Sequence, residues 1–376
     1  MKLTLKTVAA ALAAAAFSGA AFAAPSVNLY GVVDTGLQYT HVTGQSTDTL
    51  EMNSGNYAGS RFGLKGSEQV GSNTVNFILE SGFASDSGVQ GKSGSIFNRE
   101  AQVNVKGDWG TFGAGRVGAF TSGSSTLSRF WDFEPFETGY LDAGVQATQV
   151  NVWRLNSNTL YYVSPKLAGI EFGGQYSLTG TSSDKETNGF ARDSHFGNAY
   201  VRWDGKTAKV IAGVEADFVG HDYRAEGQPN KTRWSAKLAG AWTPEGGPAT
   251  LFAGYNYYKN QNRFADSTWD DDGKVVFDGS GRGLEGHAVY LGGRYQIGAA
   301  SLLAQIQFLK GKNKGAVEGD EASYKRYVAS LGAHYSFSKR TMGYAVASYA
   351  KGTGLLDTDA SQTNRVVTTV GVTHWF

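Results

Sequence analysis

Apolar and polar side chains alternate at every second residue along most of this chain, and this alternation constrains its fold more than any other feature. Between residues 27 and 39, one face carries Val27, Leu29, Val33, Leu37 and Tyr39, and the other carries Asn28, Asp34 and Gln38. Residues 75–83 and 100–106 follow the same pattern. Successive side chains of a β-strand point to opposite sides, so a period of two predicts strands whose two faces meet different surroundings. We therefore expect an all-β protein.

Sixteen such segments can be placed between turn signals, and the connections between them alternate in length. Tight turns such as Gly71-Ser72 and Ser338-Lys339 alternate with long polar stretches such as 41–58, 117–151 and 260–284. An even number of antiparallel strands, with short turns and both termini on one rim and long loops on the other, is typical of a transmembrane β-barrel. The expected strands cover residues 27–40, 59–69, 73–84, 99–107, 110–116, 152–163, 167–178, 195–204, 207–218, 231–243, 249–259, 285–297, 299–310, 324–336, 341–351 and 364–376.

The sheet is expected to close on itself because its outer face would lie in lipid. No segment after the N-terminal region approaches the ~20 apolar residues that a membrane-spanning helix requires. Lipid offers no hydrogen-bond partners for backbone N–H and C=O groups, and closure of the sheet lets neighbouring strands supply them all. A closed barrel of about 16 strands leaves a lumen too wide for side chains to fill. A soluble β-sandwich alternates as well, so the membrane location depends on the asymmetry of the loops and on an export signal.

Residues 1–23 have the features of a secretory signal peptide. Lys2 and Lys6 precede an Ala-rich apolar stretch, and Ala21-Phe22-Ala23 matches the pattern that signal peptidase cleaves after. A membrane anchor is the alternative, but the apolar stretch is short and rich in Ala and Gly. We therefore expect export through the periplasm, with residues 24–376 forming the barrel.

Composition and the remaining motifs argue against several classes of function. The chain has 34 Lys plus Arg against 33 Asp plus Glu, so no basic excess points to a nucleic-acid partner. It has no Cys, which excludes disulfides and thiolate chemistry. Gly113–Gly118 fits a dinucleotide-binding pattern but lacks the required βαβ context. Asp193-Ser194-His195 cannot form a triad, because neighbouring side chains on an extended chain point apart. We expect no catalytic residues, no metal site and no cofactor.

Four short segments carry a resemblance to a known family: Val27–Gly31, Gly59–Gly66, Trp109–Arg116 and His374–Phe376. They are similar to segments of the Gram-negative general porins, most closely those of beta-proteobacteria. The resemblance implies a homotrimeric, 16-stranded outer-membrane channel surrounded by lipid, through which ions and small hydrophilic solutes diffuse passively. It also implies insertion by the barrel assembly machinery, for which the C-terminal aromatic Phe376 is the signal. A channel dedicated to a sugar or an organic anion is the alternative, and an outer-membrane barrel enzyme is a third possibility.

The porin resemblance also implies a third loop that folds into the lumen and faces a cluster of arginines, and residues 117–151, the longest gap between expected strands, are its candidate. A loop of this length is usually functional. It is too rich in aromatic side chains to remain in water, so we expect it to dock on the barrel wall. The aromatic residues are Phe120, Phe130, Trp131, Phe133, Phe136 and Tyr140. Among them stand Asp132, Glu134, Glu137 and Asp142, and we expect the first three to form the acidic side of a pore constriction. Residues 133–137 resemble, in scrambled order, the Pro-Glu-Phe core of the porin constriction loop.

The basic side of the constriction is expected to consist of arginines. Arg61 shares a face with Lys65, and Arg154 lies opposite its apolar neighbours, so alternation points both into the lumen. The porin resemblance implies that Arg61, Arg116 and Arg154 form the cluster. Arg116 has the parity of the apolar face, and a bulge at Gly115 would turn it inward.

Other residues of the expected lumen play secondary parts. Glu80 faces inward and is expected to support the arginines, with Lys65 nearby, whereas Arg99 has the apolar parity of a rim or loop residue. The alternative is that Arg61 and Arg154 only pair with neighbouring acids. Tyr30 and Tyr162 are expected to face inward, too few for an aromatic path through the pore.

Overall fold

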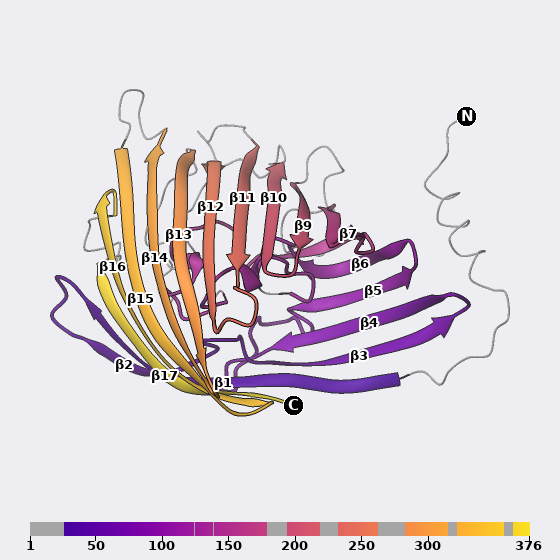
Figure 1. The fold of residues 1–376 in the computed structure, drawn as a ribbon, viewed down its shortest axis with the longest axis horizontal. Helices are drawn as coiled ribbons and strands as arrows, with labels where there is room; N and C mark the ends of the chain where they lie inside the picture. Colours follow the sequence, from indigo (N-terminus) through magenta and orange to yellow (C-terminus); the bar gives the residue numbers. More distant parts are fainter. Residues whose placement is uncertain are drawn as a thin grey trace.

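Backbone pairing between the first and last strands closes one antiparallel sheet into a barrel (Figure 1). The computed structural model describes residues 26–123, 125–137, 139–178, 194–218, 232–261, 283–314, 322–356 and 364–376. No helix among these residues is long and apolar enough to cross a membrane. The strands are β1 (Ser26–Val42), β2 (Thr49–Ser54), β3 (Arg61–Val70), β4 (Asn73–Gly82), β5 (Glu100–Gly107), β6 (Gly110–Gly118), β7 (Leu155–Val163), β8 (Ile170–Ser177), β9 (His195–Asp204), β10 (Ala208–Phe218), β11 (Arg233–Trp242), β12 (Ala249–Gln261), β13 (Leu284–Ile297), β14 (Ala300–Asn313), β15 (Ala322–Ser338), β16 (Thr341–Gly354) and β17 (Arg365–Trp375).

The 17 strands occupy 16 positions around the barrel, because β2 and β3 share one edge of β1. β3 pairs with the Ser26–Val32 half of β1, and β2 pairs with the Thr35–Thr40 half. The expected 16-stranded barrel is confirmed, and each expected strand overlaps an observed one. The expectation that residues 41–58 form only a loop is wrong. Residues 49–54 within that stretch extend the sheet as β2.

Alternation decides which side chains face outward. In β1, Leu29 is 64% exposed and Leu37 is also exposed, whereas Asp34 and Gln38, on the opposite face, are buried. The exposed apolar face is the one that would contact lipid, where polar groups are expensive. Asp34 is held at the inner face by three backbone N–H groups of residues 56–58 and by the hydroxyls of Tyr344 and Thr373. The expected polarity of the two faces is therefore confirmed for this strand.

The connection between β6 and β7, residues 119–154, is called the third loop below, and its described residues (119–123, 125–137 and 139–154) lie inside the barrel. Figure 1 shows it between the wall that contains β10 to β16 and the side that contains β3 to β6. It contains two short 3-10 turns, η1 (Trp131–Phe133) and η2 (Val145–Ala147). The expected folding of this loop into the lumen is confirmed.

The apolar core of the protein lies between the third loop and the inner wall. Phe120 and Phe133 are fully buried against wall residues such as Tyr200 and Tyr290. Phe136 packs in a second cluster with Tyr344 and others from the last strands. Burying one large apolar side chain contributes about 1.5–3 kcal/mol, so these phenylalanines hold the loop on the wall. The loop is therefore a docked part of the structure.

The C-terminus is fixed on the rim that carries the short turns. The N–H of Phe376 donates to the carbonyl of Gly31 at 3.1 Å, and the N–H of Gly31 donates to the carbonyl of Phe376 at 3.1 Å. The side chain of Phe376 is exposed on the outer surface. The C-terminal aromatic residue therefore takes part in the seam that closes the barrel.

Candidate pore constriction

Two arginines meet one glutamate on the wall formed by β3 and β4. Glu80 faces inward from β4, and its side chain is 4% exposed. The Nε atom of Arg99 lies 2.7 Å from Oε1 of Glu80, and that of Arg61 lies 3.3 Å from Oε2. Tyr30 donates its hydroxyl to the same carboxylate at 3.0 Å. This cluster places guanidinium groups beside the lumen, with the acid beneath them.

Alternation in β3 explains why Arg61 points inward, and Lys65 shares its face. Arg61 pairs with Val32 of β1, which pairs on its other side with Trp375 of β17. These residues form one row across three adjacent strands. Lys65 lies further along β3, with its ammonium group 4.8 Å from the centre of the Tyr30 ring. Arg99 precedes β5 as a loop residue. Its position in the alternating pattern did not predict an inward side chain, but the structure turns it towards Glu80, in the group that Arg61, Arg99, Glu80 and Tyr30 form (the Glu80 cluster).

Glu137 is the carboxylate that the third loop presents to the same space. Its Oε1 accepts from Nη2 of Arg294 at 2.6 Å, and its Oε2 accepts from the hydroxyl of Tyr57. Burial, followed by the charge of Glu137, raises the pKa of Tyr57 well above its usual value, so the phenol keeps its proton and donates. Glu137 has a φ of 51°, in the left-handed region that non-glycine residues rarely adopt. The two hydrogen bonds help to hold this strained residue in place.

A cavity of about 400 Å³ separates the Glu80 cluster from the third loop. Arg61, Glu80 and Arg99 line one part of it, and Glu137 lines another. Trp131, Trp153 and Trp375 line it as well. Opposite charges therefore face one space inside the barrel, where low-dielectric walls strengthen their field. Of the residues expected at the constriction, Arg61 and Glu137 meet here.

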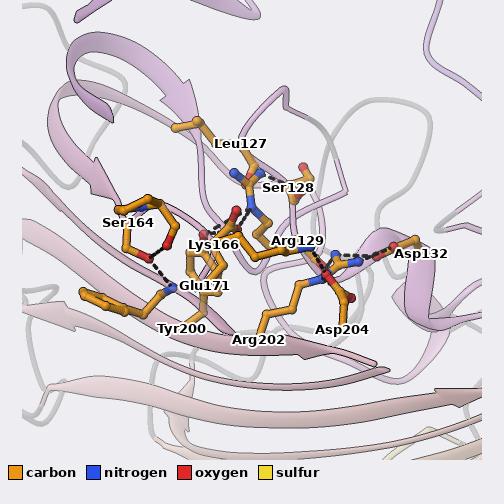
Figure 2. Close-up of polar contacts among 12 residues, drawn as sticks. Leu127, Ser128, Arg129, Asp132, Ser164, Lys166, Glu171, Tyr200, Arg202 and Asp204 are labelled. Atoms are coloured by element: carbon orange, nitrogen blue, oxygen red, sulfur yellow. Dashed lines mark hydrogen bonds and ion pairs between the residues drawn. The ribbon is translucent and has the colours of Figure 1, made fainter. Parts of the chain in front are cut away.

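The third loop directs Asp132 and Glu134 elsewhere. Asp132 binds Arg202 at 2.8 Å and Lys209 at 3.3 Å, on the wall formed by β9 and β10. Figure 2 shows this corner, where Arg202 lies between Asp132 and Asp204. Glu134 is buried and accepts a hydrogen bond from the N–H of Val145 at 3.2 Å. Neither acid lines the cavity.

A second ion pair in Figure 2 fastens the same part of the loop. Arg129 donates from Nε to Glu171 at 2.7 Å and to the hydroxyl of Tyr200 at 3.2 Å. Burial lowers the pKa of Arg129, but the interactions with Tyr200 and Glu171 outweigh this and raise it. The segment from Arg129 to Asp132 is therefore held to the wall by charges from β8, β9 and β10.

Arg116 and Arg154 bond to wall residues outside the cavity. Arg116 donates from Nε to the carbonyl of Asn98 at 2.8 Å and from Nη1 to the hydroxyl of Ser157 at 2.9 Å. Arg154 pairs with Asp217 at 2.6 Å, and its guanidinium lies 3.9 Å from the centre of the Phe196 ring. The pairing of Arg154 is the arrangement considered as the alternative above.

The bulge beside Arg116 lies on the neighbouring strand. Gly115 and Val117 are two residues apart in β6, but their partners in β7, Thr159 and Asn156, are three apart. The extra residue is therefore in β7, where Asn158 has a φ of 52°. β6 keeps its register with β5 through Arg116, so the bulge considered at Gly115 does occur beside it but belongs to β7.

The same bulge reverses the faces of the two tyrosines that follow it. Tyr161 is buried and donates its hydroxyl to Gln102 on the inner face. Tyr162 donates to the carbonyl of Trp109 and packs beside the exposed Phe172. The expectation that Tyr162 faces the lumen is therefore wrong, because one extra residue flips every later side chain of a strand.

Asp142 forms the most buried charged cluster of the loop. Its carboxylate lies 2.7 Å from Nη2 of Arg326 and 2.6 Å from Nε of Arg365, and the side chains of Asp142 and Arg326 are both 0% exposed. Arg326 also donates to the carbonyl of Ala147 at 2.8 Å. The sequence analysis did not predict either arginine as a partner of the loop. Each is followed in its strand by an apolar residue, so alternation places the arginine on the inner face and could have indicated it.

A family model for the Gram-negative porins matches residues 9–355 of the chain. The chain is 30% identical over 406 aligned residues to an outer membrane porin protein of Bordetella pertussis, covering 99% of this chain and all of the relative. It is 31% identical over 209 residues to outer membrane porin protein 32 of Delftia acidovorans, covering 54% of this chain and 58% of that one.

Solved structures show the same fold at lower identity. An anion-selective porin from Comamonas acidovorans superposes with a TM-score of 0.70 at 20% identity, covering 94% of this chain and all of the other. The outer membrane channel DcaP of Acinetobacter baumannii superposes with a TM-score of 0.63 at 14% identity, covering 94% of this chain and 97% of the other.

Proposed function

The chain belongs to the Gram-negative porin family, and from this premise we propose that it forms a water-filled channel for the passive diffusion of ions and small hydrophilic solutes. The protein is a channel of the Gram-negative outer membrane and not an enzyme. The observation that carries the proposal is the cavity between the Glu80 cluster and Glu137, where charged side chains line a space inside the barrel.

We place the constriction of this channel between Arg61 and Arg99 on the wall and Glu137 on the third loop. Arginine suits the wall position because guanidinium stays protonated beside another cation. The field between the two sides orients polar solutes and disfavours solutes that cannot replace the water they lose. Lys65 and Glu80 contribute from the same wall. Four other expected residues do not line the cavity and are bound to other groups: Arg116, Arg154, Asp132 and Glu134.

The channel is proposed to prefer anions. The side chains of Arg61 and Arg294 are 26% and 28% exposed, whereas those of Glu80 and Glu137 are 4% and 16% exposed. The arginine side chains are thus more exposed than those of their acidic partners. The porin from Comamonas acidovorans, of the same fold, is described as anion-selective, which agrees with this proposal.

Recording from the purified protein in a planar lipid bilayer tests the proposal. We expect stepwise, ohmic conductance and, in a salt gradient, a reversal potential that indicates anion preference. A heat-denatured sample of the same preparation is the control. Absence of conductance would refute the channel, and a cation-selective reversal potential would refute the assigned preference.

We further propose that three copies assemble in the outer membrane after cleavage behind Ala23, with Phe376 recognised by the barrel assembly machinery. Residues 1–25 lie outside the described part of the chain, so the leader is supported by its sequence alone. Sequencing of the mature N-terminus should begin at Ala24, and cross-linking in membranes should give trimers. Phe376→Ser should reduce the heat-modifiable, membrane-inserted form, and Phe376→Tyr should retain it. An unprocessed N-terminus would contradict the cleavage, and monomers alone would contradict the trimer. Equal insertion of both Phe376 variants would contradict recognition of the C-terminal aromatic residue.

A further inference from the structure

Three of the eight tryptophans of the chain line the cavity at the constriction. Trp131 is 43% exposed and Trp153 is 39% exposed, so much of each indole faces the space within the barrel. The lumen of a water-filled barrel is ordinarily polar. Large apolar side chains gathered on an exposed surface mark a place where another molecule binds. The tryptophans therefore call for an explanation that the passage of hydrated ions does not supply.

The three indoles come from separate parts of the chain. Trp131 belongs to η1 of the third loop, Trp153 lies near the end of the same loop, two residues before β7, and Trp375 ends β17. Trp375 lies in the same cross-strand row as Arg61, with Val32 between them. Its ring and that of Tyr57 form a T-shaped pair, with 6.1 Å between ring centres and 83° between ring planes. Aromatic surface and guanidinium groups thus converge on one cavity.

This combination matches a small solute that joins a flat apolar ring to a carboxylate. A guanidinium binds a carboxylate through two parallel hydrogen bonds. Aromatic rings pack favourably against indole rings in offset or edge-to-face arrangements. An inorganic anion would use only the arginines, and a neutral aromatic alcohol only the tryptophans. The cavity volume of about 400 Å³ lies within the range of sites that bind small molecules.

We propose that this cavity is a binding site for small aromatic carboxylates, with the carboxylate at Arg61 and Arg99 and the ring on Trp131 and Trp153. The inference rests on the proposed channel function and names a preferred class of solute for it. Binding should be weak, because a solute that passes through a channel must also leave it. Such a site would enrich aromatic acids at the constriction while leaving the channel open to other anions.

Competition with chloride current in a planar bilayer tests the site. Benzoate is the probe, and cyclohexanecarboxylate and benzyl alcohol are the controls that lack the aromatic ring and the charge, respectively. We expect benzoate to block the current reversibly, at concentrations roughly two- to ten-fold lower than cyclohexanecarboxylate, because only benzoate stacks on indole. Equal block by both acids would overturn the proposal. No conductance in any condition would refute the channel itself, so the two failures are distinguishable.

Substitution locates the binding in the protein. Trp131→Leu and Trp153→Leu should each weaken the block by benzoate roughly two- to ten-fold relative to the block by cyclohexanecarboxylate. Trp109→Leu is the matched control, because Trp109 lies at the turn between β5 and β6 and does not line the cavity. It should leave the block unchanged. Equal sensitivity of all three variants would overturn the assignment to the cavity.

A binding measurement on the unmodified protein avoids dependence on the folding of variants. The tryptophan fluorescence of the detergent-folded wild-type barrel should change on titration with benzoate and saturate. The same titration with cyclohexanecarboxylate should need a several-fold higher concentration. A fluorescence change that is linear in benzoate and never saturates would contradict a defined site.

Discussion

The guanidinium of Arg365 donates hydrogen bonds to both oxygens of the Asp142 carboxylate, from Nε to Oδ2 at 2.6 Å and from Nη2 to Oδ1 at 3.0 Å. The two residues are 223 positions apart in the sequence, and the contact joins the third loop to the last strand of the barrel. Arg326 binds the same carboxylate from β15. One acid of the loop therefore binds two arginines of the wall at once, and this contact joins the loop to β15 and β17.

Asp142→Asn should release the third loop from this side of the wall. The substitution removes the carboxylate that binds both Arg326 and Arg365, and breaking a buried pair in this way costs about 3–5 kcal/mol. We expect noisier single-channel currents and faster cleavage of the loop by proteases. Asp48→Asn is the matched control, because Asp48 is exposed and pairs only at the surface with Tyr39 and His41. Identical behaviour of the two variants would contradict the role assigned to Asp142.

The docking of the loop should weaken only in strong acid. Burial raises the pKa of Asp142, but the charges of Arg326 and Arg365 outweigh this and lower the pKa from 3.8 to about 2. The difference corresponds to about 2 kcal/mol. Because the pKa is lowered by docking, this contribution is complete above about pH 4 and is lost as the pH falls towards about 2.

Single-channel recording between pH 7 and pH 2 would follow this transition. We expect steady currents down to about pH 4 and increasing fluctuation below it. Asp142→Asn should fluctuate at every pH, with no acid transition of its own from this site. An onset of fluctuation near neutral pH in the wild type would show that another group controls the loop.

Neutralising arginines should change ion selectivity according to their distance from the cavity. Arg61→Gln and Arg99→Gln should each lower the ratio of anion to cation permeability about five-fold, since a unit charge at 4 Å in water contributes about 1 kcal/mol. Arg116→Gln and Arg154→Gln should have smaller effects, because neither side chain lines the cavity. Reversal potentials in a salt gradient measure these ratios. A larger shift for Arg116→Gln than for Arg61→Gln would reverse our assignment of the constriction.

Two neighbouring glycines of β13 should respond differently to the same substitution. A Cβ atom at Gly292 would lie 2.7 Å from Cγ of Pro135 in the third loop, whereas one at Gly293 would have no neighbour closer than 3.7 Å. Overpacking of this kind costs about 1–3 kcal/mol. We expect Gly292→Ala to shift the loop and alter conductance, and Gly293→Ala to leave conductance unchanged. Equal conductance of both variants would show that Pro135 yields without moving the loop.

Local properties of the sequence determined the barrel. A period of two depends only on the direction of successive side chains, so the strands and the polarity of the β1 faces could be predicted without knowing any partner. The aromatic content of residues 117–151 likewise predicted that the loop would dock, because apolar surface avoids water wherever the wall lies. The same parity placed Arg61 and Glu80 on the inner face. β2 was not predicted. It has only six residues, which pair with β1 beyond the end of β3, and so short a segment shows little alternation of its own.

Tertiary structure alone decided which charges meet. The four acids of the third loop are similar in sequence, yet Glu137 reaches the cavity, Asp132 binds β9, Glu134 is buried and Asp142 binds the last strands. Which partner each acid meets depends on the path of the docked loop along strands that are distant in the sequence. A single extra residue in β7 also exchanged the faces of Tyr161 and Tyr162. Alternation is a local property that the sequence carries by itself, whereas ion pairing depends on distances that exist only after the barrel has closed around its loop.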